Sequence, residues 1–167
     1  MKNTILYFIL FWSVHLAAQF QSVEIGVGGL TCSACSRSVE MSLRKLPFVD
    51  SISMNLERTN AKIFFKKIAF VEIEKIANAV VNAGFSVTYL NAEFLFTNTI
   101  VSNNFCFSFE NNKYQFLLDA TKTLNGKKTL HFIGDKYLSK KEMGTWKARM
   151  KGICALSAKE KLYYVTL

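Results

Sequence analysis

Residues 23–40 read VEIGVGGLTCSACSRSVE, and this stretch joins a strand pattern to a helix pattern through a glycine turn and two cysteines. Its first part alternates apolar with polar or small residues, as expected of a strand with one buried face: Val23, Ile25 and Val27. Its last part begins an apolar stripe at helical spacing. The two cysteines, Cys32 and Cys35, are therefore predicted to lie where a strand passes into a helix.

Strand and helix patterns continue to alternate as far as residue 90. Pro47 is expected to end the first helix, and Gly84 is placed to cap the second. The predicted elements after the first strand are, in order, a helix over 35–46, strands over 52–56 and 61–65, a helix over 73–81 and a strand over 85–89. This βαββαβ order predicts an α+β fold of the ferredoxin-like type, with both helices on one face of a four-stranded antiparallel sheet.

Several segments of this region resemble the heavy-metal-associated domain, the family of small copper chaperones and of the N-terminal repeats of copper-transporting ATPases. The family pattern is Gly-Met-Thr-Cys-x-x-Cys, and residues 29–35 read GLTCSAC. Residues 49–65, VDSISMNLERTNAKIFF, resemble the family's second hairpin, and residues 73–87, IEKIANAVVNAGFSV, resemble its second helix and the loop after it. The resemblance covers residues 23–90 and implies a metal site at the two cysteines.

A pair of thiolates suits a soft ion of low coordination number such as Cu(I). Cys32 is expected in the loop and Cys35 near the first turn of the helix, where the helix dipole favours thiolate over thiol. Two sulfurs with this spacing can meet at one ion and leave it accessible. The resemblance implies that the ion is Cu(I) and that it passes by ligand exchange to a partner, either a metal-transporting ATPase or another thiol-bearing acceptor.

Other uses of the two cysteines stay open at this point. Hg(II) also accepts two thiolates, and the family includes the periplasmic mercury scavenger. Thr31 stands where members that favour zinc or cadmium often carry Asp, and a closed Zn(II) site needs four ligands, so Zn(II) is the weaker alternative. A thiol–disulfide redox protein uses the same spacing, and an exported dithiol can rest as a disulfide.

Two residues near the motif bear on the family pattern. Leu30 replaces the usual Met; in the family that side chain packs inward and orders the loop, and Leu fills a similar volume. Phe85, after Gly84, stands where relatives carry Tyr, Phe or Lys near the metal. The resemblance implies that Phe85 shields the site, and both residues also fit as ordinary core residues.

Residues 1–18, MKNTILYFILFWSVHLAA, follow the order charged, apolar, small that is typical of a secretory signal peptide. The apolar run from Ile5 to Val14 is short for a membrane span, which needs about 20 residues. Cleavage is expected near Ala18, with an uncleaved anchor as the alternative. The expected product is an exported protein of the periplasm or cell envelope of a bacterium, with no transmembrane span in the mature chain.

The formal charge of +9 is unevenly spread along the chain. Residues 19–90 contain eight basic and six acidic residues, whereas residues 91–167 contain twelve basic and six acidic residues. The lysines are scattered, so a solvated surface is expected and nucleic acid is not an expected partner. No Ser-His-Asp set, paired carboxylates or phosphate loop stands out, and the chain is not expected to be an enzyme.

Residues 92–167 are expected to form a small β-rich domain that follows the metal-binding domain of residues 19–91. Strand-like runs alternate here with turn signals, and Ser139 with Glu142 forms a capping box at the start of a helix. A small OB-like barrel is one shape that fits this order. The sequence does not reveal a function for this half.

The remaining chemistry-bearing residues of this half have ordinary structural explanations. Cys106 and Cys154 either bridge in an oxidising compartment or remain buried thiols. His131 stands in an apolar strand and is expected to be structural. Core packing is also the expected role of three aromatic residues: Phe107, Phe109 and Trp146.

Overall fold

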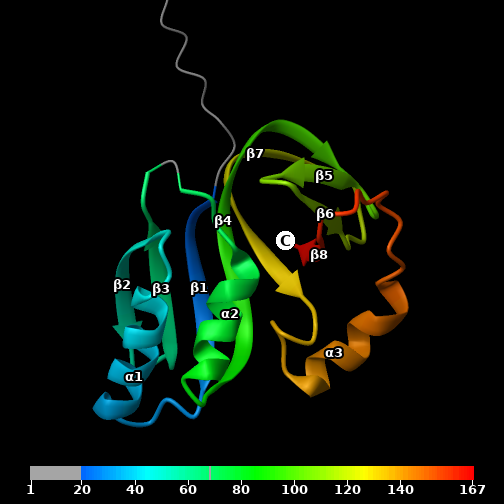
Figure 1. Cartoon of the computed structure of the whole chain (residues 1–167). Helices are drawn as coiled ribbons and strands as arrows, with labels where there is room; N and C mark the ends of the chain where they lie inside the picture. Colours follow the sequence, from blue (N-terminus) through cyan, green and yellow to red (C-terminus); the bar gives the residue numbers. More distant parts are fainter. Residues whose placement is uncertain (1–19, 68) are drawn as a thin grey trace, which may run out of the picture.

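A computed structural model describes residues 20–67 and 69–167 of the chain (Figure 1). The elements are, in order, β1 (Phe20–Gly28), α1 (Ser33–Arg44), β2 (Val49–Asn55), β3 (Asn60–Phe65), α2 (Ile73–Asn82), β4 (Ser86–Val101), β5 (Cys106–Phe109), β6 (Asn112–Phe116), β7 (Lys122–Ile133), α3 (Lys140–Trp146), the 3-10 turn η1 (Lys147–Arg149) and β8 (Leu162–Thr166). The signal peptide predicted over residues 1–18 lies outside the described residues. Within those residues, no helix has the length and apolar character needed to cross a membrane.

The first half of the chain has the predicted βαββαβ order, and its strands lie in the order β2-β3-β1-β4. All the ladders between these strands are antiparallel. Helices α1 and α2 contact each other and lie over one face of this part of the sheet (Figure 1). The residues of β1 predicted to face the core are fully buried: Val23, Ile25 and Val27. The ferredoxin-like prediction for residues 23–90 is confirmed.

Strand β4 is 16 residues long and belongs to both halves of the chain. It pairs with β1 along its first part, and from Asn91 onward it pairs with β7 on its other edge. Alternate residues in its middle are buried: Leu90, Ala92, Phe94 and Phe96. The expected boundary between residues 91 and 92 therefore falls inside a strand, and the eight strands form one sheet in the order β2-β3-β1-β4-β7-β8-β6-β5.

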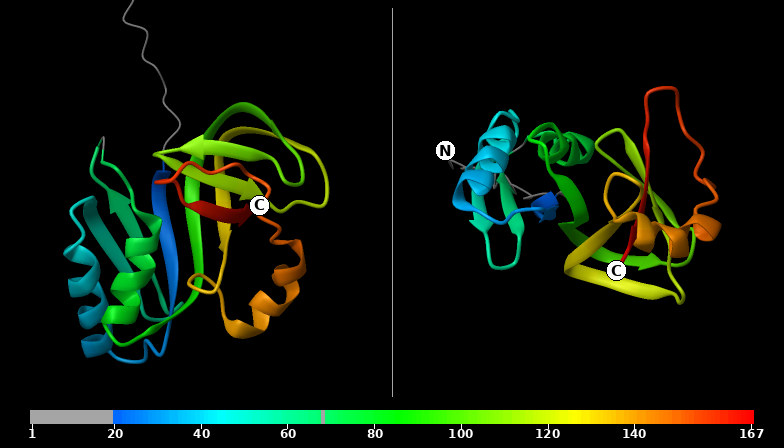
Figure 2. Two further views of the ribbon diagram at one scale, coloured as in Figure 1. Left: turned by 45° about the vertical axis from the view of Figure 1, so that its right-hand side comes forward. Right: turned by 90° about the horizontal axis from the view of Figure 1, so that it is seen from below.

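The strands of the second half curl around an aromatic core (Figure 2). β6 runs parallel to β8, and β8 runs antiparallel to β7. β5 is the last strand of the sheet, yet the ring centroid of its Phe109 lies 5.0 Å from that of Phe94 in β4. The five strands β4, β7, β8, β6 and β5 form a barrel that is partly open, because no ladder joins β4 to β5 in the described part of the chain. The predicted capping box of Ser139 and Glu142 begins α3.

Phe20, the first described residue, ties the start of β1 to the second half. Its side chain is 5% exposed, and its ring packs edge-on against Phe94, Phe109 and Tyr114. Such aromatic pairs add stability beyond the apolar area that they bury. The two halves therefore share one continuous core.

Glu74, in the first turn of α2, forms ion pairs with Lys136 and Lys161 of the second half. Hydrogen bonds from these two ammonium groups hold the pKa of the Glu74 carboxyl below its usual range. A lowered pKa in the folded state stabilises the fold at any pH above the ordinary pKa of glutamate. This contribution is lost as the pH falls through the lowered value.

We expect Glu74→Gln to lower the free energy of unfolding at neutral pH by about 0.5 kcal/mol, a small effect because the ion pairs are partly exposed to solvent. The difference should vanish in acid, where the carboxyl is protonated in both states. Urea unfolding followed by circular dichroism at several pH values measures it. Glu57→Gln, in an exposed turn, removes the same charge and is the control. A difference that stays constant with pH would contradict the prediction.

Candidate metal centre

The two cysteines lie where β1 ends and α1 begins, as the sequence predicts. Cys32 is the N-cap residue of α1 and has an extended backbone, while Cys35 lies in the first helical turn. The backbone N–H of Cys35 donates a hydrogen bond to Cys32 Sγ over 3.1 Å. The sulfur of Cys32 thus takes the place of the serine or aspartate oxygen that caps other helices.

The helix end favours a negatively charged sulfur at this position. The first turn of a helix has N–H groups without helical partners and carries partial positive charge. The first turn of α1 contains no acidic residue that would oppose this effect. The thiolate is the form of cysteine that binds metals, so the local structure supports metal binding.

The structure shows the pair in its oxidised form, with Cys32 and Cys35 joined in a disulfide and their Cα atoms 5.2 Å apart. Cys32 is exposed, whereas Cys35 is half-buried and packs against the core. Reduction would release two sulfurs at one point of the surface. Across residues 20–67 and 69–167, no group of three or more His, Cys, Asp or Glu side chains gathers into a metal site. The reduced centre therefore offers two sulfur ligands.

The loop before Cys32 is anchored by Leu30, whose side chain is 1% exposed. The inward packing that the resemblance implies for this position is present with Leu in place of Met. Gly29 precedes it with φ of +87°, a left-handed conformation that favours glycine. The loop thus turns sharply and holds the first cysteine at the surface.

Phe85 approaches the same loop from the end of α2. This helix ends in a Schellman motif, in which Gly84 N–H donates to Val81 O and Phe85 N–H donates to Val80 O. The motif directs Phe85 toward the loop, since a Cβ added to Gly29 would lie 3.8 Å from the phenylalanine ring. Phe85 therefore lies beside the loop that carries the first cysteine, where a shielding side chain is expected.

We expect Gly84→Ala to lower the free energy of unfolding by about 1 kcal/mol, because the φ of +90° at this position strains any residue with a Cβ. No atom lies within 4 Å of the added Cβ, so the cost is conformational. Gly144→Ala, within helix α3, is the matched control and should be stabilising by roughly 0.5–1 kcal/mol. Urea unfolding measures both values. Equal effects of the two substitutions would contradict the argument.

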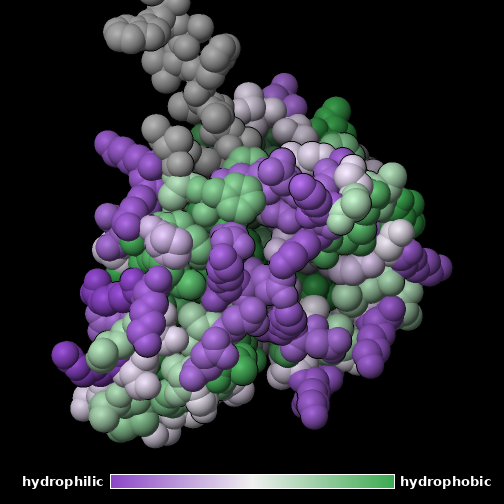
Figure 3. Space-filling view, viewed as in Figure 1, coloured by the Kyte–Doolittle hydropathy of each residue, from purple (hydrophilic) through white to green (hydrophobic). Residues whose placement is uncertain are grey.

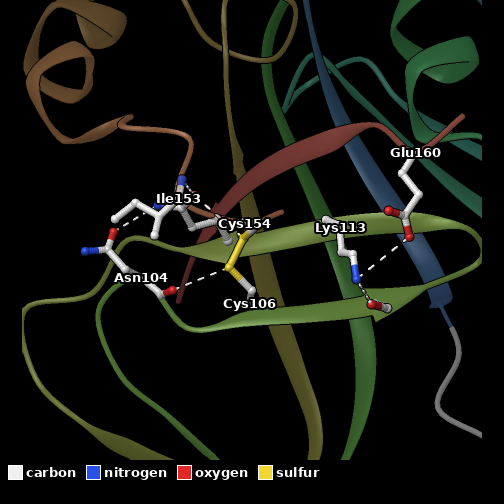
Figure 4. The surroundings of a disulfide bond; sticks show 8 residues. Asn104, Cys106, Lys113, Ile153, Cys154 and Glu160 are labelled. Atoms are coloured by element: carbon white, nitrogen blue, oxygen red, sulfur yellow. Dashed lines mark hydrogen bonds and ion pairs between the residues drawn. A yellow bond between two sulfur atoms is a disulfide. The ribbon is translucent and has the colours of Figure 1, made fainter. Parts of the chain in front are cut away.

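The second cysteine pair forms a disulfide between β5 and the segment after η1, with the Cα atoms of Cys106 and Cys154 5.8 Å apart (Figure 4). The sequence leaves this pairing open. The fully buried Gln115 holds the same region: its amide nitrogen donates to Asn104 Oδ1 over 2.9 Å, and its Oε1 accepts from Ile153 N–H over 3.0 Å. Sequence reasoning missed Gln115, because a glutamine in a strand usually faces solvent.

His131 lies in β7 and pairs with the neighbouring strand, with Nδ1 2.7 Å from Asn91 Oδ1. Burial lowers the pKa of His131. In the part of the chain that the structure describes, it joins no cluster of metal-binding side chains with either cysteine pair. The site residues that the structure brings together are therefore Cys32 and Cys35.

Comparisons with known proteins find similarity in the first half of the chain. The pattern of the family described as heavy-metal-associated domain matches residues 24–86. The copper-transporting ATPase RAN1 of Arabidopsis thaliana is 36% identical over 73 residues, which are 44% of this chain and 7% of the ATPase. The mercuric transport protein periplasmic component of Shigella flexneri is 30% identical over 83 residues, 46% of this chain and 90% of that protein. A crystal structure of a copper binding domain from HMA7, a P-type ATPase, is 34% identical with a TM-score of 0.37, covering 46% of this chain and 95% of that chain.

The extent of these matches differs between the relatives. The chain spans 7–10% of the length of the ATPases and 74–90% of the length of the mercuric transport proteins. The family pattern ends at residue 86. Strands β5 to β8 therefore lie outside it.

Proposed function

The chain belongs to the heavy-metal-associated family through residues 24–86, and on this premise we propose that it is an exported protein that binds one Cu(I) ion through Cys32 and Cys35. A soft heavy-metal ion is the ligand class of the family. The protein would buffer the ion or pass it to the thiols of a partner, without catalytic turnover.

The observation that carries this proposal is the pair of sulfurs at the exposed N-terminus of α1. Cys32 is exposed and Cys35 is half-buried, so an ion held between them remains open on one side. Two thiolates satisfy Cu(I) or Hg(II). A structural Zn(II) site needs four ligands, and the described residues gather no such set.

The choice of Cu(I) over Hg(II) rests on how much of this chain each kind of relative covers. Relatives named for copper transport and for mercuric transport both match this chain. The match covers 90% of the Shigella flexneri mercuric protein but 46% of this chain, so about half of this chain has no counterpart there. This additional half favours a role other than that of a single-domain mercury scavenger.

Export is supported by the disulfide between Cys106 and Cys154, which lies outside the metal site, because structural disulfides persist in oxidising compartments and are rare in the cytosol. The exposed position of Cys32 at the start of α1 leaves the centre open to the thiol of a partner. A metal-transporting ATPase or another thiol-bearing acceptor fits this approach.

A titration of the reduced protein with Cu(I), in the absence of oxygen and against a competing chelator, tests the proposal. We expect retention of one equivalent at free copper well below micromolar. Loss of the ion to the chelator, together with reduction of a disulfide substrate, would favour the redox alternative. The metal content of the protein, purified without oxygen from its own host compartment, decides between the two metals: we expect copper, and mercury would favour the scavenger role.

A further inference from the structure

The loop between β3 and α2 presents two lysines and an aromatic side chain. Lys66 and Lys67 are exposed, and the side chain of Phe70 is 48% exposed between them and α2. We propose that this loop face, defined by Lys66, Lys67 and Phe70, docks the protein on an anionic lipid bilayer. Exposed lysines beside an aromatic side chain are the combination that binds such surfaces, since the charges attract headgroups and the ring enters the interface.

The loop face adjoins carboxylates as well as lysines. Its three residues line a hollow of about 440 Å³ whose described lining contains one acidic residue, Glu110. Phe70 also lines a second hollow with Glu72 and Glu74, each of which forms an ion pair with a lysine. The carboxylate of Glu110 accepts a hydrogen bond from Val71 N–H over 2.9 Å. Burial raises the pKa of Glu110. Lys66 and Lys67 outnumber this one carboxyl in the first hollow, so the formal charge of its described lining is positive. The space-filling view shows hydrophilic and hydrophobic residues adjoining on this side of the molecule (Figure 3).

The chain enters the described structure at the same place. Phe20 and Gln21, which begin β1, line the same hollow as the loop face. The 19 residues that precede Phe20 include the apolar run from Ile5 to Val14. If this run is retained as an anchor, it attaches the chain to the membrane at the end of the molecule that carries the loop face.

The length of β1 determines how far the cysteine loop lies from a bilayer that binds the loop face. The strand has nine residues, so about 26 Å separate Phe20 from Gly28 at the entrance to the cysteine loop. A bilayer at the loop face therefore leaves the cysteines pointing away from the lipid, toward soluble or membrane-protruding partners. Docking does not require a metal ion, so the result of a lipid-binding test is independent of whether the protein binds copper.

Vesicle flotation tests the docking with the chain from Gln19 to Leu167, which contains every helix and strand described above and whose cooperative unfolding is checked first. We expect binding to vesicles with anionic phosphatidylglycerol, weak binding to phosphatidylcholine alone, and loss of binding at high salt. Lys66→Glu with Lys67→Glu should lower the partition coefficient at least about tenfold. Phe70→Ser should lower it further.

Matched controls separate the loop face from overall charge and hydrophobicity. Lys140→Glu with Lys141→Glu changes two exposed lysines of α3 and shifts the net charge equally. Leu156→Ser removes an apolar side chain that is 50% exposed elsewhere. The proposal is supported if the loop variants lose binding and these controls keep it. Equal losses in both sets, equal binding to neutral vesicles, or preference for an acidic protein or nucleic acid over the vesicles would overturn it.

Discussion

The double substitution Cys32→Ser with Cys35→Ser is expected to lower the affinity of the reduced protein for Cu(I) by more than about a hundredfold, because changes in the outer shell of a metal site alone cost ten- to a hundredfold. Hydroxyl groups are hard and protonated at neutral pH, so they do not replace thiolates at a soft ion. Competition with a chromophoric chelator measures the loss. The effect should be equally visible with Hg(II).

The fold is expected to survive this substitution. Serine is among the best N-cap residues, so the hydroxyl at position 32 can accept the hydrogen bond that Cys35 N–H now donates to sulfur. Far-ultraviolet circular dichroism of the variant should therefore match that of the unmodified protein. The matched control, Cys106→Ala with Cys154→Ala, removes as many thiols and should retain one equivalent of copper. Equal loss of binding in both double variants would show that the ion binds elsewhere or bridges the two pairs.

Removal of the second disulfide is expected to have the largest effect on stability. Cys106 and Cys154 are 48 residues apart in sequence, and closing a loop of this length in the unfolded chain contributes about 4 kcal/mol in the chain-entropy estimate. Cys106→Ala with Cys154→Ala should lower the free energy of unfolding by about this amount, as measured by urea unfolding without reductant. The disulfide also holds the segment after η1, where Cys154 is 7% exposed.

The first cysteine pair provides the comparison for this stability prediction. Cys32 and Cys35 are three residues apart, so their disulfide closes a short loop and restricts the unfolded chain less. The serine variant of that pair should be destabilised clearly less than the alanine variant of the second pair. Equal destabilisation of the two variants, or a loss below about 1 kcal/mol for the second pair, would contradict the assigned roles.

The elements of the first half could be predicted because each carries a local signal. Alternation marks β1, Pro47 follows the end of α1, and Gly84 takes the left-handed conformation of a Schellman turn. The position of the cysteines followed from their place between a strand pattern and a helix pattern. Local pattern was sufficient to locate these elements. The pairing of β1 with β4, which joins residues as distant as Ile25 and Leu90, followed from the βαββαβ order and from the family resemblance.

The organisation of the second half depends on contacts between distant residues, which a single sequence does not reveal. Alternation continues through β4 from residue 86 to residue 96, yet it does not show that the strand changes partners near Asn91. The parallel pairing of β6 with β8 joins residues 49 positions apart, such as Lys113 and Leu162. The pairing of Cys106 with Cys154 is likewise set by the fold, since cysteine spacing alone does not determine connectivity.

X-ray absorption spectroscopy of the reduced, full chain loaded with one equivalent of Cu(I) tests the central claim most directly. The proposed centre predicts a first shell of two sulfur atoms per copper, and loss of that shell in the Cys32→Ser, Cys35→Ser variant. A shell of three or four sulfurs, or one dominated by nitrogen and oxygen, would contradict a digonal site at the end of α1.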